Sequence, residues 1–121
     1  LDGPNGEAAV IGSDGMGYHL WGHKYGSRCY LTGLGNVWPK IEVDFYNKLE
    51  SGDEKGALDI VTRNELDYLC TTKATGRYWS CLKFFLDQIG LPGGPMRPPV
   101  LDVTEQDQKN LLDMAKRTGL L

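Results

Sequence analysis

Two histidines four residues apart, His19 and His23, are the first candidates for chemistry in this sequence. In a helix this spacing places both imidazole rings on one face, as metal-binding helices require. A zinc-protease helix would carry a glutamate directly after the first histidine, where this chain has Leu20, and a metal site would need a third ligand. The pattern therefore favours solvated or hydrogen-bonded histidines on an outer helix, and no metal site is predicted.

Two nucleophiles, Ser13 and Cys29, lie next to short apolar runs. Ser13 lacks the Gly-x-Ser-x-Gly frame of the hydrolase elbow, because Ile11 stands two residues before it. Cys29 could pair with one of the histidines, but nothing in the spacing fixes that geometry. The glycines of residues 12–17 do not follow the Gly-x-Gly-x-x-Gly pattern of dinucleotide binding. We expect a loop serine, a free thiol and no cofactor.

The position of Asp14 is more informative than its residue type. The apolar runs 8–11 and 29–32 are both followed by glycine-rich loops, and they read as two strands of a parallel sheet. In parallel α/β folds, ligands lie at the carboxyl ends of the strands. Asp14 is the only carboxylate at either end. It either orients a substrate hydroxyl or caps the following helix, and the sequence favours neither.

Composition excludes several classes of protein. The 121 residues and 13.4 kDa suffice for one small domain but fall short of the roughly 250 residues of a closed α/β barrel. With 13 basic and 16 acidic residues and no charge block, the chain resembles neither nucleic-acid-binding nor membrane-surface proteins. Three widely spaced cysteines favour free, buried or half-buried thiols, and no apolar run could span a membrane. We expect a cytoplasmic location.

The elements that position these residues begin with a βαβ unit. A helix over residues 16–25, with Met16, Leu20 and Tyr25 facing inward, connects the two strands. Asn36 is expected to cap the next helix, whose apolar face carries Val37, Ile41, Phe45 and Leu49 at four-residue spacing and which ends at Gly52.

The remainder reads as helices around one long loop. Asp53 is expected to cap a helix whose apolar face carries Ala57, Leu58, Val61, Tyr68 and Leu69. Residues 77–89 give the clearest amphipathic pattern, and residues 90–103 are too rich in glycine and proline for a helix. Thr104 and Asp107 resemble a capping box opening a last helix with Leu111, Leu112 and Ala115 on its inner face.

Two strands are too few for an independent sheet. A two-stranded parallel pair leaves both edges unpaired and cannot hide its own backbone groups. The sequence therefore predicts that the sheet continues in residues that this chain does not contain.

Several short segments occur in an order that resembles a known family, the dihydrodipicolinate synthase and N-acetylneuraminate lyase family. They are Val10–Asp14, Leu31–Pro39, Leu82-Lys83 shortly before Gly90-Leu91, Gly94–Pro99 and the terminal Gly119-Leu120-Leu121. The resemblance implies the C-terminal portion of a (β/α)8 TIM barrel. Residues 1–52 would hold the last two βα units, strands seven and eight, and residues 53–121 a C-terminal helical extension.

The family's activity implies class I aldolase or lyase chemistry on pyruvate or another 2-oxo acid. Its members form a Schiff base on a lysine of the sixth strand, which would precede Leu1, so this chain would be an inactive fragment. Lys83 matches a helix outside the barrel and is not expected to replace that lysine. The resemblance also suggests a homotetramer, with the remainder of the barrel as partner.

Carried over by position, the resemblance assigns three substrate-binding residues. Leu31 matches the eighth-strand residue whose backbone approaches the 2-oxo acid, and Gly12 and Asp14 match the loop after the seventh strand. The alternative reading is a non-catalytic interaction or oligomerisation module, in which the helices after Asp53 form a surface and the strands dock onto a partner.

Overall fold

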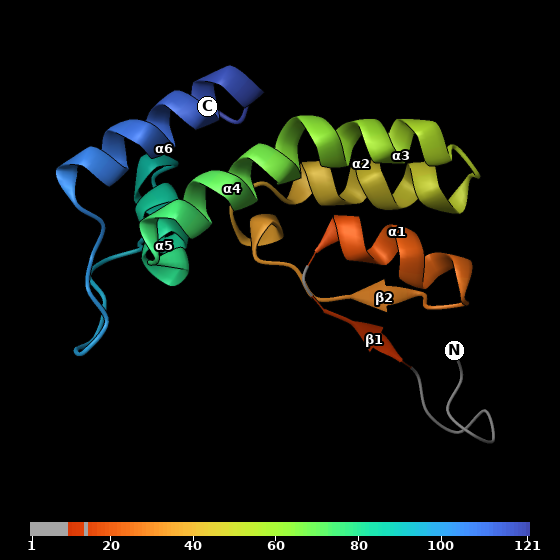
Figure 1. Ribbon diagram of the computed structural model, residues 1–121, viewed down its shortest axis with the longest axis horizontal. Helices are drawn as coiled ribbons and strands as arrows, with labels where there is room; N and C mark the ends of the chain where they lie inside the picture. The colour runs from red at the N-terminus through yellow and green to blue at the C-terminus, as the bar shows by residue number, and fades with distance from the viewer. Residues whose placement is uncertain (1–9, 14) are drawn as a thin grey trace. The chain divides into compact units, whose positions relative to one another are not determined.

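The computed structural model describes residues 10–13 and 15–121. By its internal contacts the chain divides into two compact units, Leu1–Thr62 and Arg63–Leu121. Figure 1 traces their elements in chain order. Within the described ranges, no helix is both long enough and apolar enough to cross a bilayer.

The first unit contains the predicted βαβ arrangement. Its elements are β1 (Ile11–Gly12), α1 (Met16–Lys24), β2 (Cys29–Tyr30), the short 3-10 turn η1 (Leu34–Asn36), α2 (Pro39–Glu50) and α3 (Glu54–Ile60). The strands are parallel, with Ile11 opposite Cys29 and Gly12 opposite Tyr30. α3 packs against both α1 and α2 (Figure 1). Half of the run predicted as the first strand, residues 8 and 9, lies outside the described residues.

The inner face of α1 differs from the prediction. Met16 is buried as expected and Leu20 is half-buried, but Tyr25 is 70% exposed. Tyr25 caps the helix, which ends at Lys24, and Gly26 then turns the chain with a φ of 93°. His19 takes an inner position and is buried. Hydrophobicity alone favours the tyrosine over the histidine as the inward residue, but the helix ends before Tyr25 and its inner face carries His19.

The start of α2 also differs from the prediction. Asn36 does not cap it, because Asn36 belongs to the 3-10 turn and Trp38 is the N-cap. Pro39 explains the shift, since proline favours the first helical position and restrains the residue before it from helical geometry. Trp38 indeed has φ −126° and ψ 67°. Phe45 and Leu49 are buried on the inner face as predicted.

The cap at Asp53 is confirmed, because its Oδ1 accepts the Gly56 backbone N–H at 2.9 Å. The chain continues from α3 through a π-helical segment, Val61–Glu65. A π turn widens the helix and changes which residues face inward. Ala57, Val61 and Tyr68 of the predicted face are buried, whereas Leu58 is 50% exposed.

The second unit consists of α4 (Leu66–Thr75), α5 (Tyr78–Gln88) and α6 (Glu105–Thr118), with α4 packed against the other two. The amphipathic helix predicted for residues 77–89 is confirmed, with Cys81, Leu82 and Phe85 buried, and residues 90–103 contain no helix. The capping box of Thr104 and Asp107 is confirmed. On α6, Leu112 is half-buried, and Met114 joins Leu111 and Ala115 on the inner face.

The cysteines follow the predicted pattern in part. All are free thiols, Cys29 half-buried and Cys81 buried, but Cys70 is exposed, contrary to the expectation.

Candidate functional site

The predicted site residues Gly12 and Leu31 meet at the carboxyl ends of the two strands. The Leu31 N–H donates to the Gly12 carbonyl oxygen at 2.9 Å, and the Leu31 carbonyl oxygen accepts the Gly15 N–H at 3.1 Å. The loop after β1 and the residue after β2 are therefore tied together through the backbone. Asp14, the third predicted residue, lies outside the described residues.

The two faces of the sheet have different surroundings at this point. Gly12 and Tyr30 are register partners, and a Cβ on Gly12 would lie 3.5 Å from the Tyr30 Cβ, so both point to the same face. The Tyr30 ring stacks on His19 of α1, which covers that face. Because side chains alternate along a strand, Ile11 and Leu31 point to the other face. They are 58% and 65% exposed.

Glu42, which the sequence analysis missed, is the buried carboxylate nearest this end of β2 along the chain. It lies in the first turn of α2 and is 8% exposed. Its two carboxylate oxygens accept hydrogen bonds from the hydroxyls of Tyr30 and Thr32. A sequence signal existed, since Glu42 precedes Phe45 by three residues and Leu49 by seven, which is the spacing of one helix face.

The histidine pair has two different environments. His19 is 1% exposed, stacks on the Tyr30 ring with 4.4 Å between centroids, and neither ring nitrogen has a hydrogen-bond partner within the described part of the chain. The prediction of a solvated or hydrogen-bonded ring is therefore wrong for His19. Burial, and then the nearby charge of His23, lower the pKa of the His19 imidazole.

His23 is hydrogen-bonded, as predicted. Its Nε2 lies 2.7 Å from Glu50 Oε1 and 2.9 Å from Arg28 Nη1. Nε2 can accept from Arg28 only when it carries no proton and can donate to Glu50 only when it carries one, so the two contacts require different tautomers of the ring. Among the residues that the structure describes, no three histidine, cysteine, aspartate or glutamate side chains are grouped to hold a metal ion.

The other residues considered as nucleophiles, Ser13, Cys29 and Lys83, have different surroundings. Ser13 is exposed, and the Cys29 thiol lies 3.9 Å from the Val10 carbonyl oxygen. Lys83 is on α5, where its Nζ donates to the Pro95 carbonyl oxygen at 2.7 Å. This bond fastens the amine to the loop after α5.

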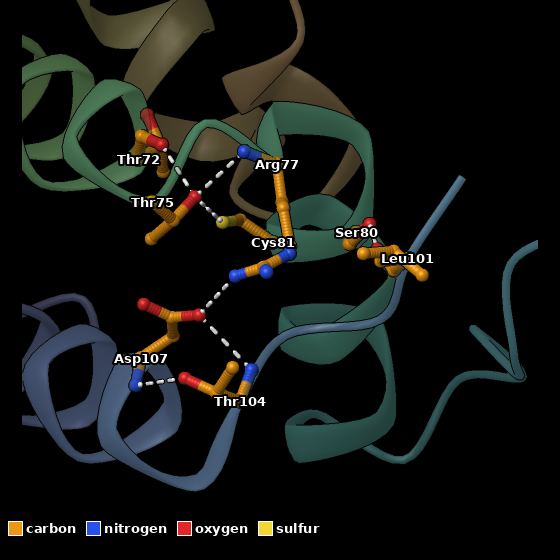
Figure 2. A network of polar contacts seen from close by, with 8 residues as sticks. All are labelled: Thr72, Thr75, Arg77, Ser80, Cys81, Leu101, Thr104 and Asp107. Carbon is orange, nitrogen blue, oxygen red and sulfur yellow. Dashed lines mark hydrogen bonds and ion pairs between the residues drawn. The ribbon is translucent and has the colours of Figure 1, made fainter. Parts of the chain in front are cut away.

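A second polar network lies at the start of α5 and α6 (Figure 2). Arg77 donates to Asp107, and Asp107 completes the capping box with Thr104. The Cys81 sulfur lies 3.3 Å from the Thr75 hydroxyl, and burial raises the pKa of the Cys81 thiol. A buried thiol with a raised pKa is a poor nucleophile, and the Arg77, Thr104 and Asp107 contacts connect the starts of two helices.

Comparison with known proteins agrees with the resemblance. The model of the dihydrodipicolinate synthetase family matches residues 8–118. A probable 5-dehydro-4-deoxyglucarate dehydratase of Rhodococcus jostii is 30% identical over 95 residues, which are 78% of this chain and 31% of that protein. A 4-hydroxy-tetrahydrodipicolinate synthase of Lachnoclostridium phytofermentans is 31% identical over 90 residues, 73% of this chain and 29% of that protein.

A solved structure shares the fold. The crystal structure of dihydrodipicolinate synthase from Oceanobacillus iheyensis matches 97% of this chain with a TM-score of 0.83 at 20% sequence identity, and the match covers 39% of that chain. This chain thus spans about a third of the length of the curated relatives that it matches. From the family match and the shared fold together, the chain belongs to the dihydrodipicolinate synthetase family.

Proposed function

We propose that this chain is the C-terminal portion of a (β/α)8-barrel lyase that acts on pyruvate or another 2-oxo acid. Residues 8–52 would provide the seventh and eighth βα units, and residues 53–121 the helical extension. The partial coverage of the relatives, 31% of the Rhodococcus dehydratase and 39% of the Oceanobacillus synthase, supports a fragment of a larger enzyme.

The lyase part of the proposal rests on the family match, and the observation that carries the fragment part is the exposure of the sheet. Parallel sheets are normally covered on both faces, and two strands do not form a stable sheet alone. β1 and β2 are parallel, yet Ile11 and Leu31 are 58% and 65% exposed on the face away from α1. Further strands would close this face into the interior of a barrel.

The chemistry would start with an imine between a lysine amine and the ketone of the 2-oxo acid, with loss of water. The protonated imine withdraws electrons, so the neighbouring carbon–carbon or carbon–oxygen bond can form or break. The lysine would lie upstream of Leu1. The substrate site at the carboxyl ends of the strands would be lined by Gly12, Asp14 and Leu31.

The test is borohydride trapping. The isolated chain and the complete enzyme are each incubated with pyruvate or 5-dehydro-4-deoxyglucarate and reduced with borohydride. The mass of each protein is then measured by mass spectrometry. We expect one adduct on the complete enzyme, at a lysine upstream of this chain, and none on the isolated chain. An adduct on Lys83 or any other lysine of this chain would overturn the proposed placement of the catalytic amine.

One observation favours a second role, an interaction or oligomerisation module. Three aromatic residues at one-face spacing on and after α1, Tyr18, Trp21 and Tyr25, are 65%, 68% and 70% exposed. Such a stripe is typical of a contact surface. Light scattering distinguishes the roles. A monodisperse species, either a monomer or a discrete oligomer, with cooperative melting favours an independent module, whereas aggregation, or tight binding to the upstream part, favours the fragment. A homotetramer and a cytoplasmic location remain part of the proposal for the complete enzyme.

A further inference from the structure

Glu42 binds the two residues on either side of Leu31. Its Oε2 accepts the Tyr30 hydroxyl and its Oε1 accepts the Thr32 hydroxyl. The carboxylate comes from α2, whereas Tyr30 ends β2 and Thr32 lies two residues beyond that strand. One buried side chain therefore fastens the end of the strand to the helix that follows it.

Neither donor is free to turn elsewhere. The Tyr30 ring is stacked on His19, and the Thr32 hydroxyl oxygen also accepts the Gly35 N–H at 3.5 Å. Gly35 packs closely against both side chains, because a Cβ at this position would lie 3.0 Å from Thr32 Cγ2 and 3.1 Å from Glu42 Cγ. The local packing therefore selects one arrangement of the three polar groups.

Leu31 is held by its backbone as well. Its N–H and carbonyl oxygen bond to Gly12 and Gly15, while its side chain points to the face opposite Tyr30 and Thr32. The position of Leu31 is thus determined from one side by the loop after β1 and from the other by Glu42 acting through two hydroxyls.

From this arrangement we propose that Glu42 is a positioning residue for substrate binding, which fixes Leu31 in the wall of the 2-oxo acid site without touching the substrate. The inference rests on the proposed function. A carboxylate suits the task, because its two oxygens can accept two hydroxyl protons, whereas the single oxygen of an amide leaves one hydroxyl facing an N–H donor. Displacing a substrate wall by about 1 Å can cost on the order of a hundredfold in rate.

The experiment uses the complete enzyme that contains this chain. Imine formation is titrated with the probe that labels the wild type, pyruvate or 5-dehydro-4-deoxyglucarate, and trapped with borohydride. We expect Glu42→Gln to raise the half-saturating concentration of the 2-oxo acid about tenfold, and kcat/KM to fall by a similar factor. Tyr30→Phe, which keeps the ring and removes one donor, should give a smaller change in the same direction.

The matched control is Asp44→Asn. Asp44 lies two residues further along α2 and pairs with Lys40 at the surface, so the control makes the same change of charge and chemistry outside the cluster. We expect the half-saturating concentration to stay at the wild-type value in this variant.

Two failures are distinguishable. If the wild-type enzyme forms no adduct with either probe, the proposed function is overturned, and the inference with it. If the wild type is labelled but Glu42→Gln melts at a lower temperature with an unchanged half-saturating concentration, Glu42 is structural only and the inference alone is overturned. If Glu42→Gln does not fold, Tyr30→Phe replaces it in the test. An unchanged half-saturating concentration in Tyr30→Phe then overturns the inference.

Discussion

Arg77 and Asp107 join the beginnings of two helices that are far apart in the sequence. Arg77 Nη1 lies 2.9 Å from Asp107 Oδ2, and the two side chains are 27% and 16% exposed. The same carboxylate oxygen accepts the Thr104 N–H at 2.9 Å, while the Thr104 hydroxyl accepts the Asp107 N–H (Figure 2). Asp107 therefore caps α6 and binds α5 at the same time.

Replacement of Asp107 by asparagine should destabilise the second unit. The change removes the ion pair with Arg77 and weakens the capping box, and we expect a loss of about 1–2 kcal/mol in the free energy of unfolding, measured by urea denaturation. The control Glu105→Gln removes a charge of the same sign from the same helix turn and leaves the capping box intact. Equal losses in the two variants would show that only the charge near the helix N-terminus matters.

Acid should act on the same group. Hydrogen bonds from Thr104 and the charge of Arg77 lower the pKa of the Asp107 carboxyl from its ordinary value of 3.8. Because the folded state holds this carboxylate ionised, its contribution is present above about pH 4 and is lost as the pH falls through the lowered value. Urea midpoints measured between about pH 6 and pH 3 should therefore converge for wild type and Asp107→Asn. Parallel curves would contradict the assignment.

His19 should make the first unit sensitive to milder acid. The pKa of its buried ring is lowered below 6.5, so the unfolded chain binds a proton at a higher pH than the folded one. Titration of His19 leaves the free energy of unfolding unchanged well above pH 6.5. The free energy of unfolding falls as the pH drops through 6.5 and levels off below the pKa of the ring in the folded state. The titratable or charged groups that act on the ring or pack against it are His23, Glu50, Arg28, Tyr30 and Tyr46.

Variants of the two histidines test this expectation. His19→Phe keeps an aromatic ring against Tyr30 and removes the titration, so its melting temperature should change less between about pH 7.5 and pH 5.5 than that of the wild type. His23→Gln should keep most of the wild-type dependence. Equal decreases in melting temperature for His19→Phe and the wild type over this pH interval would contradict the expectation.

Two adjacent glycines in the loop after α5 are required for different reasons. A Cβ on Gly93 would lie 2.0 Å from the Lys83 carbonyl oxygen, whereas a Cβ on Gly94 would meet nothing within 4 Å, but the φ of Gly94 is +66°. Gly93→Ala should cost about 2–3 kcal/mol, because the helix backbone cannot move aside. Gly94→Ala should cost about 1 kcal/mol from its left-handed backbone. Urea denaturation measures both, and the reverse order would contradict the clash.

Lys83 should be dispensable for imine formation. Its amine bonds to the Pro95 carbonyl oxygen, so Lys83→Met in the complete enzyme should release the loop and leave borohydride trapping intact. The release would appear as faster exchange of the Met96 amide hydrogen in Lys83→Met than in the control variant Lys73→Met. Lys73 lies on the exposed surface of α4. Loss of the adduct in Lys83→Met would instead identify this lysine as the reacting amine.

Local rules explain most successful predictions of the fold. The Asp53 cap, the Thr104 and Asp107 capping box and the amphipathic face of α5 depend on residues within about one helical turn of each other. Neighbouring residues also explain why α2 starts later than predicted. The restraint that Pro39 places on the backbone of Trp38 outweighs the capping tendency of Asn36.

The sequence by itself determined the order of the elements, the parallel βαβ unit and the resemblance to the family, because periodicity, caps and short motifs act over neighbouring residues. Only the tertiary structure decided which side chains meet. It buried His19 beneath Tyr30 and brought the Glu42 carboxylate to two hydroxyls, 10 and 12 residues away along the chain. The physical reason is that a buried polar group must find its partner wherever the folded backbone places one, and no local pattern specifies that place.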